Sequence, residues 1–493
     1  MRPGGSGVSP TNDGGRARLA RGRHPSAGIP GAMIAALVAA FATEARANPF
    51  IEIASAADPE DPFDVNITVD YEFYSKSAAV RRELAGFPGT DPDGPVPLVK
   101  DLIFSSTRHE VIPKLEVGIF TDLAVYATLP VIIHDSRRLE LDQTAENCVF
   151  PGGAGQATCI DRTNSTTIQD GLLPNTGFDA EDPSAGFTGS DPLIFRGVDR
   201  WGLDQIHLGL AWAPMNQRRD DTKPTWKIGG EVRVAIGNEM RLDRMDPDAE
   251  TGVGRGIHEV KLWTSLAKRT RWAIPYFEAW WMATVGETDE SQFRDPPQGL
   301  FGAERTSPQQ HAGTRFGFEA VAWQGENDQQ RVGIDASAIF EAHFEGREYS
   351  EMWEVFAFAG DARAAGPLVL EADPTAGGPL FSHPGVSNIE NYLTAAGRFG
   401  IHASLGPRVQ FGTHFQYNWH QSHIITFADA GVDLATCSGG QTAGCEIDNN
   451  DVVNPGTVEV NPFHVPGLDT VGNRYRVDES RTYQLSVAAM VLF

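Results

Sequence analysis

The stretch of sequence that decides the fold covers residues 63–75, which read Phe-Asp-Val-Asn-Ile-Thr-Val-Asp-Tyr-Glu-Phe-Tyr-Ser. From Val65 to Phe73 every second residue is apolar, and the residues between them are polar or charged. A period of two is typical of a β-strand with one apolar and one polar face. Because the alternation lasts for about ten residues, such a strand is long enough to cross a lipid bilayer at a tilt.

The same alternation returns along the chain and gives about twelve candidate strands. The others lie near residues 115–119, 123–129, 206–212, 226–236, 256–267, 271–285, 313–324, 332–340, 393–401, 411–419 and 483–493. Short and long connections alternate between them, as in bacterial outer-membrane barrels, which have short periplasmic turns and longer outer loops. The sequence therefore predicts an all-β protein: a transmembrane antiparallel up-and-down β-barrel of about 12 strands with long extracellular loops.

The composition agrees with this fold class and excludes others. The 493 residues include 52 Gly and 32 Pro, which break a chain into many short segments. No run of apolar residues reaches the 18 that a membrane-spanning helix needs. The net charge of −25 opposes binding to phosphate backbones, so we expect no nucleic-acid partner.

The N-terminus has the pattern of a secretory signal peptide. Four arginines clustered at positions 16–23 precede an apolar stretch at 29–42, and Ala45-Arg46-Ala47 resembles a cleavage site. Translation could begin at Met1 or at Met33, and an ordinary buried helix is the alternative to a signal peptide. We expect a cleaved signal peptide over 1–47, a short periplasmic N-terminal segment over 48–62 and an outer-membrane β-barrel over 63–493. The protein would then reside in the outer membrane of a Gram-negative cell.

The cysteines agree with export to an oxidising compartment. The chain has four, at Cys148, Cys159, Cys437 and Cys445. They could pair in three ways, and closeness in sequence favours Cys148–Cys159 and Cys437–Cys445. Metal binding is the competing interpretation, but neither pair has the spacing of a zinc motif.

The chain end and the tryptophans give two further signs of a membrane barrel. Phe493 closes an alternating strand, which resembles the C-terminal signal that the outer-membrane insertion machinery recognises. We therefore expect this machinery and outer-membrane lipid as partners. Tryptophans near short turns would form an interfacial belt. These are Trp212, Trp226, Trp272 and Trp323.

Two hairpins resemble a known family. The first is Leu115-Glu-Val-Gly-Ile-Phe-Thr-Asp-Leu-Ala-Val-Tyr-Ala-Thr-Leu-Pro130, and the second joins Ile206-His-Leu-Gly-Leu-Ala-Trp212 to Ile228-Gly-Gly-Glu-Val-Arg-Val-Ala-Ile-Gly237. They are similar to hairpins of the outer-membrane transporters named after the meta-pathway of phenol degradation. The resemblance covers about residues 109–285. It implies a barrel that moves small, often hydrophobic, molecules, and it supplies no binding residues. The long acidic loops of this chain depart from the compact members.

If the apolar positions face lipid, the alternate positions face the barrel interior, the lumen. The predicted lumen-lining residues are Asp64, Asp70, Glu72, Lys114, Glu116, Lys227, Glu231, Arg233, Glu259, Lys261, Arg315, Glu319, Asp335, Glu341, Arg398, His402, His414 and His420. Such charges either hold the wall together or set the selectivity of a narrow conduit.

The strand over 411–419 needs a separate interpretation. His414, Gln416, Asn418, His420 and Ser422 share one face. A polar lumen wall is the simplest explanation. A metal site lacks a third ligand fixed by spacing. The His-x-Ser of 420–422 resembles the catalytic pair of outer-membrane phospholipases, but the accompanying Ser-Asn-Gly is absent. We therefore predict no catalytic residue, no cofactor and no metal ligand.

The expected function is a channel or transporter-like barrel for small-molecule solutes, hydrophobic or aromatic compounds among them. The alternative is a plugged structural or adhesive surface barrel whose loops carry the function. An open axial path would favour transport, and a filled lumen would favour the surface role. The apolar segment 352–358 inside a long loop is expected to fold inward as a plug, cover the mouth, contact solute or form an extra strand.

Overall fold

The computed structural model of the protein describes residues 50–56, 63–84, 96–143, 160–294, 307–325, 330–371, 378–406, 408–431, 461 and 463–493. The predicted signal peptide and all four cysteines lie outside the described residues. Cleavage after residue 47 and the two disulfides therefore stay predictions.

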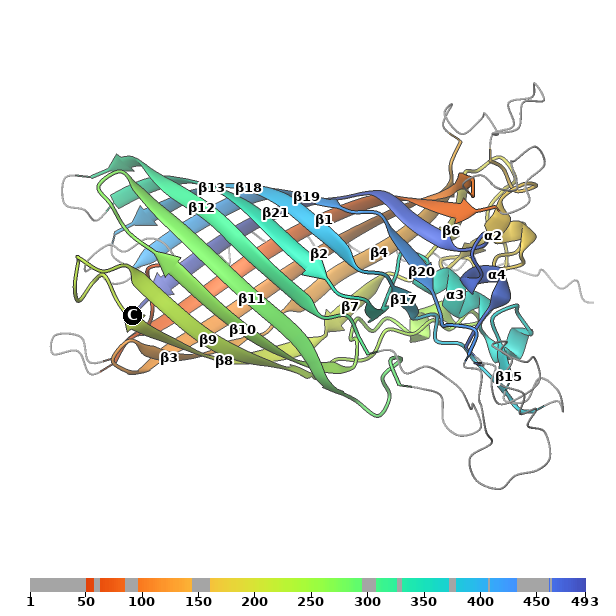
Figure 1. Ribbon diagram of the computed structural model, residues 1–493, viewed down its shortest axis with the longest axis horizontal. Coiled ribbons are helices and arrows are strands. Elements are labelled where there is room, and N and C mark those ends of the chain that lie inside the picture. Colours follow the sequence, from red (N-terminus) through yellow and green to blue (C-terminus); the bar gives the residue numbers. More distant parts are fainter. Residues whose placement is uncertain are drawn as a thin grey trace, which may run out of the picture. The chain divides into compact units, whose positions relative to one another are not determined.

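Twelve antiparallel strands close into a barrel within the described part of the chain (Figure 1). In ring order they are β1 (Val65–Glu83), β2 (Leu98–Phe120), β3 (Leu123–Thr128) continued by β4 (Val131–Leu141), β7 (Arg200–Leu203) continued by β8 (Gln205–Met215), β9 (Thr225–Ala235), β10 (Ile257–Ala267), β11 (Ala273–Glu287), β12 (His311–Gln324), β13 (Gln330–His343), β18 (Tyr392–Leu405), β19 (Val409–His420) and β21 (Tyr475–Leu492). The ring closes where β21 pairs with β1. Closure leaves no unpaired sheet edge, and it confirms the predicted fold class.

The barrel has two different ends. At one, which we call the turn end, the connections are short, such as residues 121–122 between β2 and β3. At the other, the loop end, they are long and carry short elements. These are α2 (Thr166–Gln169), β5 (Phe178–Asp179), β6 (Leu193–Arg196), η1 (Pro247–Ala249), β14 (Gly346–Glu348), α3 (Trp353–Ala359), η2 (Ala362–Ala364), β15 (Leu370–Glu371), β16 (Leu380–Phe381), β17 (Ser387–Ile389), β20 (His423–Thr426) and α4 (Pro466–Asp469).

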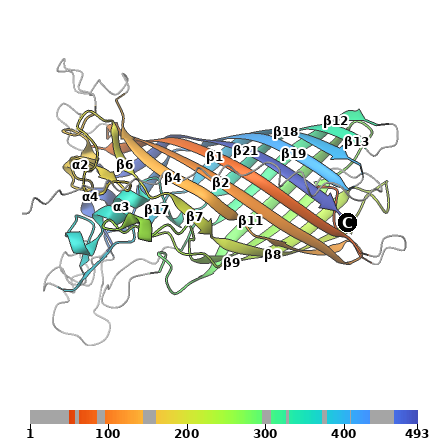
Figure 2. The same ribbon diagram turned by 180° about the vertical axis from the view of Figure 1, so that it is seen from behind.

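Figure 2 shows the C-terminus at the turn end, opposite the helices. None of the helices in the described part is long and apolar enough to cross a membrane.

The outer face of the wall is apolar, as the alternation predicts. Large apolar side chains are exposed there on every second residue of the strands, for example Ile67 and Val69 on β1 or Phe316 and Phe318 on β12. An exposed apolar surface of this extent needs an apolar environment. It has the periodicity that faces lipid in a membrane barrel.

Tryptophans mark two levels on this outer face. Trp201 and Trp212 lie on the continuous strand β7–β8, and Trp272 precedes β11, which carries Trp281. All four are exposed, as are Trp226 and Trp323. Eleven residues separate Trp201 from Trp212, about 36 Å along a strand, or about 25 Å along the axis of a barrel tilted by about 45°. That spacing matches the apolar band of an outer-membrane barrel.

The largest apolar core lies at the loop end. Met352, Val355, Phe356 and Phe358 of the α3 region pack there with apolar residues from several connections and from the ends of β1, β2, β4 and β21. We call this body the loop-end cap, meaning α3 and the described residues of 160–196, 344–391 and 421–474. The apolar segment 352–358 thus forms a buried helix, so the expectation of an extra strand is wrong. It contains no Gly or Pro that would interrupt a helical turn.

Candidate functional site

The lumen holds the polar and charged faces of the strands. Apart from Asp64, which directly precedes β1, the residues predicted to line it occupy strand positions that alternate with the exposed apolar ones. They are Asp64, Asp70, Glu72, Lys114, Glu116, Lys227, Glu231, Arg233, Glu259, Lys261, Arg315, Glu319, Asp335, Glu341, Arg398, His402, His414 and His420. Some contacts on this face reach past neighbouring strands: Trp263 of β10 donates from Nε1 to the Tyr126 hydroxyl of β3 at 3.2 Å, across β8 and β9.

Residues 50–56, which we call the N-terminal segment, lie against these inward faces near the turn end. The Ala54 N–H donates to Glu116 Oε1 at 3.0 Å, and Lys227 Nζ donates to the Glu52 carbonyl at 3.1 Å. The Phe50 ring stacks on Tyr276 with centroids 4.0 Å apart. This segment belongs to the stretch expected to precede the barrel on the periplasmic side.

Apolar side chains also hold the N-terminal segment. Ile53 and Ala54 are buried in one cluster with Tyr126, Ala211 and other inward residues. Ile51 is buried in a second cluster with Ala267, Ile274 and Tyr276. At these inward positions the barrel wall has mostly small or aromatic side chains. They form an apolar surface that is complementary to the N-terminal segment. Part of the lumen at the turn end is therefore filled by chain that is not part of the wall.

A cavity of about 400 Å³ adjoins the N-terminal segment inside the barrel. Phe50, Glu52 and Ile53 form one side of it. The wall contributes the rest of the lining, which combines charged and aromatic side chains: Lys114, Glu116, Tyr126, His207, Lys227, Glu231, Lys261, Trp263, Glu278 and Arg315 are among them. A small solute that has both an apolar ring and polar groups would find partners for each.

One network of paired lumen charges is centred on Glu319. Glu319, fully buried, lies 2.6 Å from Arg331 Nη2 and 2.8 Å from His402 Nδ1, and His402 Nε2 lies 2.6 Å from His414 Nε2. This places three of the predicted residues in one chain of contacts across β12, β18 and β19. Because the buried Glu319 carboxylate has the Arg331 guanidinium as its opposite partner, the cost of its desolvation is offset.

A second network lies near the cavity. Glu231 Oε1 accepts from Arg233 Nε at 2.7 Å, and its Oε2 accepts from the Tyr126 hydroxyl at 3.0 Å. Arg315 lies 3.4 Å from Asp335 and has its guanidinium 5.1 Å from the centre of the Phe50 ring. The N-terminal segment is thus in contact with the charged wall as well as with its apolar residues.

The loop-end cap is tied to the barrel by buried ion pairs. Arg200, at the start of β7, is completely buried and donates from Nη2 to Glu354 Oε1 of α3 at 2.8 Å. The same guanidinium donates to the carbonyls of Glu250, Gly252 and Arg241. Lys76 of β1 lies 2.7 Å from Glu351, just before α3. These contacts hold α3 at the mouth of the lumen.

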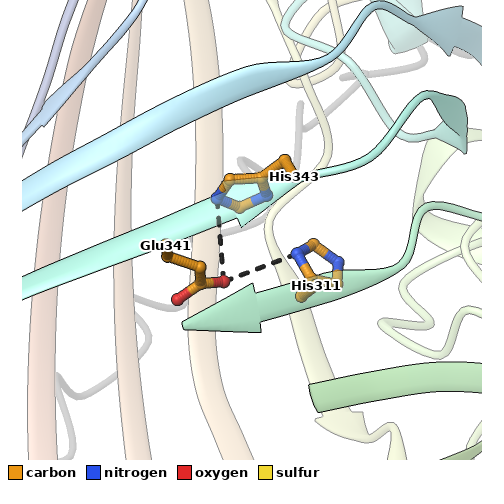
Figure 3. A group of neighbouring side chains, drawn as sticks. All are labelled: His311, Glu341 and His343. Atoms are coloured by element: carbon orange, nitrogen blue, oxygen red, sulfur yellow. Dashed lines mark ion pairs between the residues drawn. The ribbon is translucent and has the colours of Figure 1, made fainter. Parts of the chain in front are cut away.

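A group that sequence reasoning missed lies at the loop end of the lumen (Figure 3). His311 of β12 and Glu341 and His343 of β13 offer ligand atoms that all lie within 4.8 Å of one another. Glu341 and His343 stand two residues apart on one strand face, a signal that the sequence carried. The partner His311 could not be found without the register, which places it directly opposite His343.

The histidine of the predicted His-x-Ser pair has other partners. His420 Nδ1 lies 2.9 Å from the Thr394 hydroxyl, and Nε2 lies 3.0 Å from the Thr482 hydroxyl. Both ring nitrogens are therefore engaged with threonines of neighbouring strands. This is the arrangement of a polar wall, and it does not pair His420 with Ser422.

Comparison with known proteins gives matches among solved structures alone. No family model and no curated protein matches the chain. The chain is similar to an outer membrane channel from Pseudomonas putida F1, at 8% identity over 91% of this chain and 100% of that chain, with a TM-score of 0.37. A Pseudomonas aeruginosa FadL homologue follows at 9% over 87% and 90%, with a TM-score of 0.31. The CymD monoaromatic hydrocarbon channel matches at 9% over 87% and 88%, with a TM-score of 0.28.

Similarities at such low sequence identity and TM-score do not establish a function for this chain. The predicted resemblance to the transporters of the phenol meta-pathway is not matched by a family model and stays a prediction.

Proposed function

We propose that the protein is an outer-membrane channel for small solutes whose turn-end entrance is closed by the N-terminal segment. The outer apolar band and its two levels of tryptophan support a place in the membrane. The observation that carries the proposal is the lumen cavity of about 400 Å³ that has residues of the N-terminal segment as one side. A cavity bounded by a segment outside the wall can open to the periplasm when that segment moves.

The cavity lining favours small solutes over large ones. Its size is at the lower end of the roughly 300–1,000 Å³ of typical ligand sites. Tyr126, Trp263 and Phe50 offer aromatic faces, while Lys114 and Glu116 offer charge. We therefore propose aromatic or otherwise amphipathic small molecules as the solute class.

The surface-barrel alternative is favoured by the filled turn end and by the loop-end cap. On this alternative the ion pairs of the lumen serve the stability of the wall alone, and the loops carry the function. The two proposals differ in one respect that can be measured. A channel must conduct when the N-terminal segment is displaced, whereas a structural barrel stays closed.

The test is single-channel conductance of the purified protein in planar bilayers. Ile53→Asp places an unpaired carboxylate among Ala124, Tyr126 and Ala211, which should expel the segment from the lumen. We expect brief, small openings for the wild type and a conductance several-fold higher for Ile53→Asp. Val69→Ala on the outer face is the matched control and should behave as the wild type.

Liposome uptake of a small aromatic solute gives the second readout. If the wild type and Ile53→Asp are both electrically silent and neither admits the solute, the channel proposal is wrong. The surface barrel then becomes the better explanation.

A further inference from the structure

The group formed by His311, Glu341 and His343 has the geometry of a cation site. Glu341 Oε1 lies 3.4 Å from His311 Nδ1 and 3.7 Å from His343 Nε2, and the two imidazole rings meet edge to face with centroids 4.6 Å apart (Figure 3). A tetrahedral Zn²⁺ with bonds of about 2.1 Å holds its ligand atoms about 3.4 Å apart. The observed separations therefore need little adjustment to surround one ion.

The strand register explains why the three side chains converge. His311 pairs with His343 across β12 and β13, and Gly313 pairs with Glu341. Opposite and diagonal neighbours on one sheet face lie within reach of each other. Gly313 has no side chain, and the Trp280 ring of β11 covers this position. Each ligand comes from a paired strand of the rigid wall.

The polar atoms of the group are not fully satisfied by the protein. Among the described residues, His343 Nδ1 is buried without a hydrogen-bond partner, and buried His311 Nδ1 has only the long 3.4 Å contact with Glu341. Buried polar atoms without a partner are uncommon and call for an explanation. A metal ion bound to His311 Nδ1 would give this atom a partner. The Thr394 hydroxyl lies 3.2 Å from His343 Nε2, and metal binding at this nitrogen replaces that contact.

The nearest cations on neighbouring elements do not occupy the group. Lys76 lies 2.7 Å from Glu351. Lys261 lies on β10, two strands from β12. It pairs with Met282 of β11, and Met282 pairs with His311 of β12. Glu341 therefore has the two imidazoles as its ion-pair partners at the distances given above.

We propose that His311, Glu341 and His343 bind one divalent cation of the Zn²⁺ type at the loop-end mouth of the lumen. Two imidazoles and one carboxylate suit first-row transition cations, whereas Ca²⁺ and Mg²⁺ require more oxygen ligands. Three protein ligands leave a position that water or a donor atom of a passing solute can take. The site needs only the folded barrel, so it does not depend on the proposed channel.

The experiment is isothermal titration of the untagged full-length protein with Zn²⁺. We expect one strong site in the wild type. Loss of a residue that only hydrogen-bonds to a metal ligand weakens metal binding by roughly 10–100-fold. His311→Gln and His343→Gln each remove a direct ligand, so each should weaken Zn²⁺ binding by more than this. Excess Ca²⁺ or Mg²⁺ should not compete.

The matched control is the double variant His402→Gln/His414→Gln. It also removes two facing histidines of the lumen, whose Nε2 atoms lie 2.6 Å apart, but leaves the proposed site intact. This variant should retain the strong site. Visible absorption of bound Co²⁺ gives a second readout, and it should be lost in His343→Gln and kept in the control.

Folding of each variant is checked by the faster migration of unheated barrels in detergent gels. If folded His311→Gln and His343→Gln bind Zn²⁺ as tightly as the wild type, the proposal is wrong. Equal loss of affinity in the control double variant would also overturn it, because the effect would then not belong to this group.

Discussion

Arg200 is the side chain that connects the barrel wall with the loop-end cap. Its guanidinium is completely buried and reaches Glu354 on α3 together with three backbone carbonyls. Such a fan of five donors in fixed geometry is a property of arginine that lysine lacks. Arg200 of β7 is therefore one of the residues that hold α3 over the mouth.

Arg200→Met should destabilise the loop-end cap by about 3–5 kcal/mol, because it leaves the Glu354 carboxylate buried without its partner. Replacing both residues by Met should recover part of this loss. The free energy of cap opening is measured by native-state proteolysis of the connections. Arg363→Met is the control, since the Arg363 side chain is exposed and its ion pair with Asp243 at the surface should be worth below about 1 kcal/mol. Equal effects of the two substitutions would contradict this account.

His383 should make the loop-end cap sensitive to acid. Burial, with a contribution from Arg347, lowers the pKa of His383 to about 3. The unfolded chain takes up a proton near pH 6.5, whereas the folded cap does not, so stability is lost as the pH falls below about 6.5. At pH 5 the expected loss is about 2 kcal/mol. Proteolysis at pH 7.5 and pH 5 measures it.

The matched variant is His383→Gln, which can keep an acceptor for the Gly385 N–H and does not titrate. Its cap stability should change less between the two pH values than that of the wild type. An identical pH dependence of both proteins would show that His383 is not the group responsible.

At the scale of the strand, the two faces should differ in their tolerance of charge. Val232→Arg on the outer face of β9 should impair membrane assembly, because a cation near the bilayer midplane costs about 2–4 kcal/mol. Asn66→Arg is the inward control, since Asn66 faces the cavity and is in register with Glu116. Gly229 is unsuitable as a control, because an added Cβ would lie 2.4 Å from Trp263 Cε2. Folded yield in liposomes measures the effect, and equal yields would contradict the assignment of faces.

The last strand closes the barrel at its seam. Phe493 and Val65 exchange two backbone hydrogen bonds, at 2.8 and 3.2 Å, just beyond the end of β21. Deletion of Phe493 removes this pair of hydrogen bonds and the predicted recognition signal. Outer-membrane insertion should therefore fall while export to the periplasm continues. Cell fractionation measures both steps. Phe493→Tyr is the control, because it keeps both backbone hydrogen bonds and an aromatic C-terminal residue. Normal insertion of the truncated chain would contradict the prediction.

The positions of the strands could be predicted from the sequence, but their lengths could not. The twelve alternating segments correspond to the twelve strands of the ring. The alternation stops near residue 75, yet β1 continues to Glu83 through two changes of register. There the strand pairs with β2 beneath the loop-end cap, and both of its faces are covered. Without one face in lipid, the period of two disappears and the sequence pattern no longer marks the strand.

At the scale of the whole molecule, the sequence could indicate which residues face inward but not which of them meet. The alternation places both Glu341 and His402 on the inward face of the wall. It does not show that Glu341 lies with His311 and His343, whereas His402 lies with Glu319. Only the register brings His311 opposite His343. The register also places Tyr126 beside Gly209 and Trp263 beside Gly229, so that the two aromatic side chains meet over these glycines. The N-terminal segment has no periodic pattern, so its place against the lumen wall could not be predicted.

The N-terminal segment has one consequence for the kinetics of opening. It is joined to β1 by residues 57–64, so a segment that leaves the lumen stays within a few residues of its binding surface. A short covalent tether gives an effective concentration on the order of millimolar, whatever the abundance of the protein. Reclosure is then a first-order event that dilution cannot slow. If the barrel is the channel proposed above, it returns to its closed state by itself after each passage.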